Sequence, residues 1–222
     1  MSCISIHQPA FLPWLGYFDK IKRSDIFVFL DSVQYEKNSF INRNKIKTPN
    51  GPIWLTVPVK KHGLEQKIQN VKVDSNQNWK KKHLNSVYMN YKKAQRFEEC
   101  YTKLESLYKE EYESLGDLCY FHLLFWLKEI GIDTKIVRSK ELNIDSRKSD
   151  LILNICEYFN ANKYISGING LNYLKKEDFN KASISIEFQN YSHPTYPQLW
   201  GDFLPKMSIL DFWMNSEQYH LI

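Results

Sequence analysis

The apolar positions of the chain form short runs that alternate with segments of helical spacing. Residues 3–6 (CISI) are mainly apolar and residues 26–30 (IFVFL) entirely so, as is typical of strands that are covered on both faces. Between them, residues 12–22 carry apolar side chains at nearly helical spacing, and Pro13 suits the first turn of a helix. This order of strand, helix and strand predicts a βαβ unit with two parallel strands.

The remaining pattern predicts an α/β fold. Residues 53–59 (IWLTVPV) indicate a third strand, and residues 78–127 are mostly helical, with Gly131 placed to end the last helix. The final third alternates again, with strands at 134–137, 163–166 and 183–188 and a helix at 149–159. We therefore predict a mostly parallel sheet in a nucleotide-binding-like three-layer arrangement. Residues 1–222 are interpreted as one domain, with a mainly helical insertion at about 78–130.

Composition bears mainly on partners and location. The formal charge of +5 favours anionic partners such as nucleotides or RNA but is low for a dedicated nucleic-acid binder. The four cysteines form no C-x-x-C pair, which indicates a cytoplasmic protein with reduced thiols. No apolar run is long enough to cross a bilayer, so we expect no direct membrane insertion.

The first group of candidate residues follows the first strand. Ligands of parallel α/β proteins gather at the carboxyl ends of the strands, and His7 and Gln8 stand at that place. Trp14 and Tyr17 follow in a loop that Pro9 and Pro13 stiffen. We expect His7 to act on a ligand and Gln8, Trp14 and Tyr17 to contact one. The alternative is a rigid turn in which His7 bonds to a buried carbonyl.

A polar segment follows the second strand. Asp31 stands where α/β enzymes often bind a ribose hydroxyl, a metal or an amine, and its alternative is a structural pairing with Lys37 or Arg43. Arg43 lies between two asparagines and suits phosphate or carboxylate recognition, unless it is a solvated surface charge. The side chains of this segment that we expect to bind substrate are Gln34, Lys37, Asn42, Arg43 and Asn44.

A second rigid polar loop occurs near the C-terminus. His193 follows a strand-like segment and precedes Tyr196 and Gln198, so it is a candidate partner for His7, as a second base or as an oxyanion donor. The alternative is that Tyr196 and the neighbouring prolines pack a crossover loop. Ser166 ends another predicted strand and is followed by glycines that suit an anion site, although turn chemistry explains them as well.

Several known binding motifs are missing. The chain has neither a GxGxxG fingerprint nor a P-loop, so a nucleotide would bind without those loops. His7, Asp31 and His193 lack zinc-type spacing, and we predict no metal site. The lysine runs at 60–61 and 80–82 are typical of solvated faces, with phosphate contact as the alternative.

Ordered segments of the chain resemble one protein family. HQPAFLPWLGYFDKI, DIFVFLDSVQYEK, NRNKI and WLTVPV in the first part resemble the start of the WbqC-like family. YISG at 164–167, HPTYPQ at 193–198 and SILD at 208–211 resemble its later motifs. Members of the family are bacterial proteins that are often encoded among surface-polysaccharide genes. The resemblance implies transfer of an acyl or aminoacyl group, such as glycyl, to a nucleotide-linked amino sugar.

These observations support one main hypothesis and two alternatives. The main hypothesis is a cytoplasmic transferase for O-antigen or other surface polysaccharide, with His7 as base and Asp31 or His193 as its partner. ATP or an aminoacyl-tRNA would supply the activated group. The alternatives are a non-catalytic protein that binds a nucleotide sugar or a pathway partner, and an RNA-associated protein that uses charged tRNA. The last requires tRNA binding that weakens steeply with salt.

The hypothesis predicts the behaviour of a His7→Ala variant. If His7 is the base, the variant should lose turnover while its melting temperature stays nearly unchanged. Turnover and thermal unfolding of the same preparation check this prediction. A large loss of stability would assign His7 a structural role instead.

Overall fold

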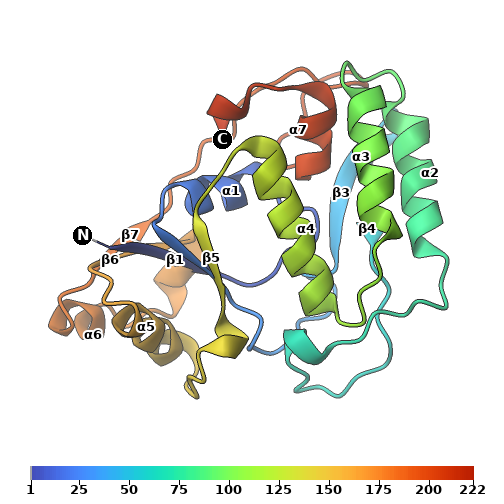
Figure 1. Cartoon of the computed structure of the whole chain (residues 1–222). Helices are drawn as coiled ribbons and strands as arrows, with labels where there is room; N and C mark the ends of the chain where they lie inside the picture. The colour runs from blue at the N-terminus through green and yellow to red at the C-terminus, as the bar shows by residue number, and fades with distance from the viewer. Residues whose placement is uncertain (1) are drawn as a thin grey trace.

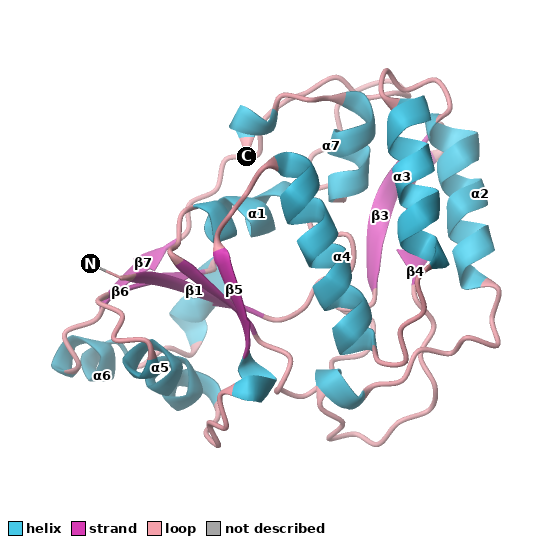
Figure 2. Ribbon diagram, viewed as in Figure 1, coloured by secondary structure: helices cyan, strands magenta, loops and turns pink. Residues whose placement is uncertain are grey.

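A parallel five-stranded sheet occupies one side of the molecule (Figures 1 and 2). The computed structural model describes residues 2–222. The strand order is β5-β2-β1-β6-β7, and every neighbouring pair is parallel. The mostly parallel α/β sheet predicted from the sequence is therefore confirmed. The strands are β1 (Cys3–His7), β2 (Ile26–Phe29), β5 (Lys135–Arg138), β6 (Lys163–Ser166) and β7 (Ser185–Phe188).

The strand order defines where this sheet can bind a ligand. From β1 the chain adds β2 and then β5 on one side, and it adds β6 and β7 on the other. The order therefore reverses between β1 and β6. In open α/β sheets a crevice forms at the carboxyl ends of the strands at this point, because the connections on the two sides leave in opposite directions. His7 ends β1 and Ser166 ends β6.

Helices cover both faces of the sheet. On one face lie α1 (Leu15–Lys22) and α4 (Leu115–Ile130), whose apolar side chains pack against Phe27 and Phe29 in the larger core. On the other face, α5 (Lys148–Tyr158) and α6 (Lys176–Lys181) pack in a smaller core. Figure 2 shows α5 and α6 below the sheet, α1 above it and α4 to its right, beside β5. The arrangement is consistent with the predicted three-layer fold.

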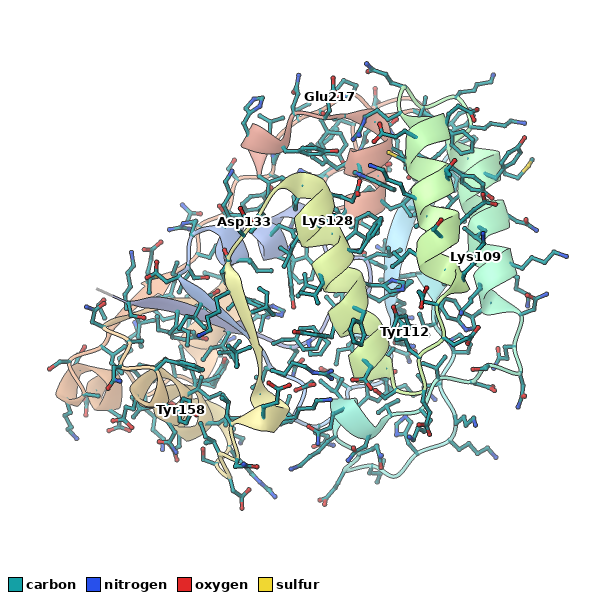
Figure 3. All side chains as sticks on the ribbon, in the orientation of Figure 1. Lys109, Tyr112, Lys128, Asp133, Tyr158 and Glu217 are labelled. Carbon is teal, nitrogen blue, oxygen red and sulfur yellow. The ribbon has the colours of Figure 1, made fainter. Side chains whose placement is uncertain are left out.

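The other helices lie beside a separate hairpin. The hairpin consists of β3 (Arg43–Thr48) and β4 (Gly51–Thr56), and α2 (Trp79–Tyr91) and α3 (Phe97–Lys109) pack next to it. Figure 3 labels Lys109 at the end of α3 and Tyr112 in the turn that leads to α4. The remaining elements are α7 (Ile209–Asn215), which packs against α3 and β3, and 3-10 turns at Ile68–Asn70, Ser139–Glu141, Ile168–Asn172 and Tyr219–Leu221.

Two element predictions need correction. The predicted strand at 53–59 belongs to the hairpin rather than to the parallel sheet, and its partner β3 (RNKIKT) was not predicted, because its charges hide the apolar alternation. The helix predicted from residue 12 begins at Leu15. Leu12 has a φ of +48°, outside the helical region, and a residue before proline disfavours that region sterically.

The helical stretch at 78–130 contributes to the sheet layer. Its last helix, α4, connects the hairpin side to β5, and Tyr120 on α4 contacts the ring of Phe29 on β2 at 5.5 Å. It ends at Gly131, which has a φ of +70° as predicted for this position. Part of this stretch therefore covers the sheet, while α2 and α3 support the hairpin.

Two histidines are buried inside the larger core. His83 on α2 and His122 on α4 both lie beside the ring of Phe11, with centroid distances of 5.8 and 6.0 Å. Burial lowers the pKa of His83 to about 4 and that of His122 to about 3. Both rings are therefore neutral in the folded protein, whereas an unfolded histidine has a pKa of about 6.5.

This difference predicts a loss of stability in acid. Below pH 6.5 the unfolded chain binds protons that the folded chain excludes, so the free energy of unfolding falls by up to about 1.4 kcal/mol per pH unit for each buried histidine. The fall should continue to about pH 4 for His83 and further for His122. In His122→Phe the free energy of unfolding should fall less steeply between pH 6 and pH 4, by the equivalent of about one bound proton. Urea titrations at several pH values measure it, with the exposed His220→Gln as control.

Candidate functional site

His7 at the end of β1 has one ring nitrogen that no described residue bonds. Its ring packs against the rings of Trp14 and Tyr17, with centroids 5.7 and 4.9 Å away. Nδ1 lies 2.9 Å from the backbone oxygen of Gln8, and since a carbonyl oxygen only accepts, Nδ1 carries the ring hydrogen. Nε2 of the neutral ring therefore holds a free lone pair. It has no hydrogen-bond partner within residues 2–222.

A buried lysine influences His7. Lys20 on α1 is 1% exposed, and its Nζ donates to the backbone oxygen of Ile6 at 3.2 Å. Burial lowers the pKa of Lys20 to about 7. Burial likewise lowers the pKa of His7 to about 3, and the charge of Lys20 adds to this effect. The His7 ring is thus neutral at pH 7, and its Nε2 can accept a proton.

A cavity of about 310 Å³ opens beside this strand end, lined by Gln8, Gln34, Tyr35 and Glu36. Gln8 follows β1 and the other three residues follow β2, so the cavity lies at the carboxyl ends of these two strands, where parallel α/β sheets commonly bind ligands. The Gln34 amide donates to the backbone oxygen of Leu64 at 2.7 Å, which orients its carbonyl end. Glu36 is exposed and forms no ion pair with any described residue. Its carboxylate is therefore available to an ammonium group.

The end of β6 forms the other side of the strand-order reversal. Ser166 is buried, and its hydroxyl donates to the backbone oxygen of Gly167 at 3.0 Å. A Cβ atom at Gly170 would lie only 2.0 Å from Ser166 Oγ, so the following turn requires glycine. Ser166 shapes this turn, and its hydroxyl is already used by the backbone.

Asp31 forms a buried ion pair, but with neither of the partners considered from the sequence. Its side chain is fully buried, and Arg138 at the end of β5 contacts Oδ2 through Nε at 2.8 Å and Nη2 at 2.6 Å. Oδ1 accepts hydrogen bonds from Ser139 Oγ and Lys140 N, each at 3.2 Å. Both oxygens are thus engaged, and no hydrogen bond joins Asp31 to His7 within the described chain. This arrangement supports the structural alternative.

The side chains of the two asparagines on either side of Arg43 also bond to backbone oxygens. Asn42 Nδ2 donates to the oxygen of Val57 at 2.9 Å, and Asn44 Nδ2 donates to the oxygen of Leu12 at 2.6 Å. Both residues are buried. The second bond ties the hairpin to the loop that follows β1, so Asn44 positions that loop.

Arg43 and Lys37 lie at the surface of the same region. The Arg43 guanidinium stacks on the ring of Trp54, with its carbon 4.3 Å from the ring centre, and Nη2 donates to the oxygen of Asn38 at 2.5 Å. Lys37 is exposed. Among residues 2–222 neither cation has a carboxylate within salt-bridge distance. Both remain available to an anionic ligand.

The C-terminal loop builds a second polar cluster around a buried carboxylate. Asp211 accepts hydrogen bonds from Tyr91 OH at 2.6 Å, Tyr196 OH at 2.8 Å and Gln198 Nε2 at 2.7 Å. Burial raises the pKa of Asp211 despite these donors. Tyr196 and Gln198 therefore support the structural alternative for this loop.

His193 belongs to this second cluster. Its Nδ1 donates to the oxygen of Pro194 at 2.9 Å, which leaves Nε2 as the acceptor, as in His7. No hydrogen bond or ring contact joins the two histidines in the described chain. Trp14, which contacts His7, and Tyr191, which contacts His193, both lie close to Gly16, where an added Cβ would lie 3.2 Å from Trp14 Nε1 and 2.8 Å from Tyr191 Cδ1. The strand expected just before His193 ends at Phe188.

The structure thus groups only some of the predicted residues. Those near the end of β1 are His7, Gln8, Trp14, Tyr17 and Gln34, with Arg43 on the adjoining hairpin. Sequence reasoning missed Lys20, Glu36 and Trp54. Trp54 could have been identified, because it occupies an alternating position of a predicted strand. The burial of Lys20 could not, because the sequence of a helix does not show which of its lysines are buried.

Within residues 2–222 no three His, Cys, Asp or Glu side chains lie close enough together to hold a metal ion. All four cysteines are free. No helix in the same residues is long and apolar enough to cross a bilayer.

Comparison with known proteins identifies relatives. The sequence model of the WbqC-like protein family matches residues 8–221. The Mycobacterium tuberculosis protein Rv1507c, which is described as uncharacterized, is 35% identical over 218 residues, covering 97% of this chain and 94% of its own. No solved structure matches the chain.

The buried pair of Asp31 and Arg138 predicts a large effect on stability. Asp31→Ala leaves a buried guanidinium with only its second carboxylate, Asp117, and should lower the free energy of unfolding by about 3 kcal/mol or more. The double variant Asp31→Leu with Arg138→Met should recover much of this loss. Denaturant titration measures both. The exposed pair of Lys175 and Asp150 is the control, and Asp150→Ala should cost less than about 1 kcal/mol.

Proposed function

Because the chain belongs to the WbqC-like protein family, we propose that it attaches an acyl or aminoacyl group, for example glycyl, to the amine of a nucleotide-linked amino sugar. The product would serve O-antigen or other surface polysaccharide synthesis from the cytoplasmic pool of sugar nucleotides. One observation carries the proposal: Nε2 of His7 has no hydrogen-bond partner within residues 2–222, and the next residue, Gln8, lines the cavity together with Glu36.

The proposed reaction uses the cavity to position the amine. Glu36 attracts the ammonium form of the amino sugar, and Gln8 offers an amide to its hydroxyls. The bound ammonium loses its first proton to solvent, and the nitrogen lone pair then attacks the acyl carbon of the donor to form the new bond. His7 Nε2 takes the second proton from the tetrahedral intermediate.

The weak basicity of His7 is compatible with this role. The nitrogen of the tetrahedral intermediate is far more acidic than a free ammonium, so a neutral imidazole of low pKa can still accept its proton. The proton then passes to the leaving group as its bond to the acyl carbon breaks, and His7 returns to the neutral state.

The activated donor decides which reaction is observed. Glycine with ATP would form a mixed anhydride before transfer, whereas a charged tRNA would bring its ester to the same amine. Both donors therefore belong in the assay.

A mass assay tests the proposed transfer. The protein is incubated with a dTDP-linked amino sugar and either glycine with ATP or glycyl-tRNA, and the sugar nucleotide is examined for a mass increase of one glycyl group. His7→Gln should lower the rate by roughly a hundredfold, because a glutamine amide cannot act as a base. Glu36→Gln should mainly raise KM for the sugar.

His220→Gln is the control, since His220 is an exposed histidine in the 3-10 turn Tyr219–Leu221. It should leave the rate unchanged. Sugar-nucleotide binding without a product from either donor would contradict the transfer and favour a binding protein.

A further inference from the structure

A continuous strip of aromatic rings leads away from His7. His7 contacts Trp14 at 5.7 Å, Trp14 contacts Phe40 at 5.6 Å, and Phe40 contacts Trp54 at 5.7 Å, all between ring centroids. We call these four side chains the aromatic strip. Its outer members are exposed, Phe40 to 45% and Trp54 to 41%. The strip thus joins the candidate site to the surface of the hairpin.

Two cations lie on the outer end of the strip. Lys45 is directly opposite Trp54 in the register of β3 and β4, and its Nζ lies 4.8 Å from the ring centre. The Arg43 guanidinium lies 4.3 Å from the same ring. Cations so close to an indole are held there by the ring, without any carboxylate.

These two cations are unpaired, unlike the other arginines near the sheet. Arg23 pairs with Asp19 and Glu187, and Arg138 pairs with Asp31 and Asp117. Within residues 2–222, Arg43 and Lys45 have no carboxylate within 4.0 Å. An exposed aromatic surface that carries two uncompensated positive charges complements a ligand with a planar ring and an anionic group.

We infer that the aromatic strip binds the nucleotide part of the sugar nucleotide. The base stacks on Phe40 and Trp54, and the diphosphate contacts Arg43 and Lys45. The sugar then extends along Trp14 to His7 and the cavity with Glu36. This inference rests on the proposed function for the identity of the sugar, and it explains how a nucleotide binds without a P-loop or a GxGxxG turn.

The order of groups along the strip follows from charge. A diphosphate needs cations, and Arg43 and Lys45 supply two of them at the Trp54 end, whereas the amine of the sugar needs a carboxylate, which Glu36 supplies at the other end. The reverse orientation would place the diphosphate beside Glu36 and leave the amine beside Arg43 and Lys45. Both contacts would then be repulsive.

Binding of dTDP and UDP, which contain no amino sugar, tests the inference. Isothermal titration measures their affinity for the parent protein and for Phe40→Ala and Trp54→Ala. Each variant should bind about tenfold more weakly, because stacking of a base on an aromatic ring contributes roughly 1–3 kcal/mol. Phe121→Ala is the matched control, since Phe121 is 46% exposed but lies on α4. It should bind as the parent does.

A second pair of variants tests the cations. Arg43→Gln and Lys45→Gln should weaken dTDP binding and reduce its salt dependence, but should affect thymidine little. Lys92→Gln is the control, since Lys92 also lies over an aromatic ring, that of Tyr88, at 5.7 Å. Circular dichroism confirms that each exposed variant keeps its fold.

The outcomes separate the inference from the proposed function. The inference would be overturned by unchanged dTDP and UDP affinity in Phe40→Ala, Trp54→Ala, Arg43→Gln and Lys45→Gln, even if transfer is observed. Weakened binding in these variants without any transfer product would support the inference and contradict only the proposed reaction. Binding of a short single-stranded RNA at the strip, with none of dTDP or UDP, would also overturn the inference.

Discussion

The guanidinium of Arg138 holds together the end of the sheet on which the site depends. It binds Asp31 after β2 and Asp117 in the first turn of α4, and it lies 4.7 Å from the ring of Tyr120. Three elements that are distant in the sequence therefore meet at one buried charge. Removing Asp31 would leave the buried guanidinium with only the partly exposed Asp117, and removing Arg138 would leave the buried Asp31 without its cation; either change costs more than the pair contributes. These ion pairs fix the carboxyl ends of β2 and β5 against the start of α4.

A second set of bonds sets the hairpin relative to His7. The amide of Asn44 donates to the oxygen of Leu12, and the backbone N–H of Phe11 donates to the oxygen of Phe40 at 3.0 Å. Both bonds link the loop after β1 to the hairpin region. The aromatic strip therefore rests on a backbone frame, which places Trp54 and its cations in line with the strand end. Two separate sheets contribute to one candidate site in this way.

His7 remains neutral because of its surroundings. Aromatic rings and the charge of Lys20 both oppose protonation of His7, while the backbone oxygen of Gln8 selects the hydrogen position. The ring is thus prepared as an acceptor and not as a cation. Positive charge is placed instead on the hairpin, at Arg43 and Lys45, where it faces solvent and can meet an anion. The proton acceptor His7 and the cations Arg43 and Lys45 therefore lie at opposite ends of the aromatic strip.

The sequence by itself determined the fold class, most strands and the place of His7, because apolar runs and strand ends are local features. It also pointed to Arg43 and to the loop with Trp14 and Tyr17. Only the tertiary structure decided the partners: Asp31 pairs with a residue 107 positions away, and Tyr196 and Gln198 serve Asp211. Neither the burial of Lys20 nor the contact between Phe40 and Trp54 could be predicted from the local sequence. Such contacts depend on how distant elements pack, and no short pattern in the chain encodes that packing.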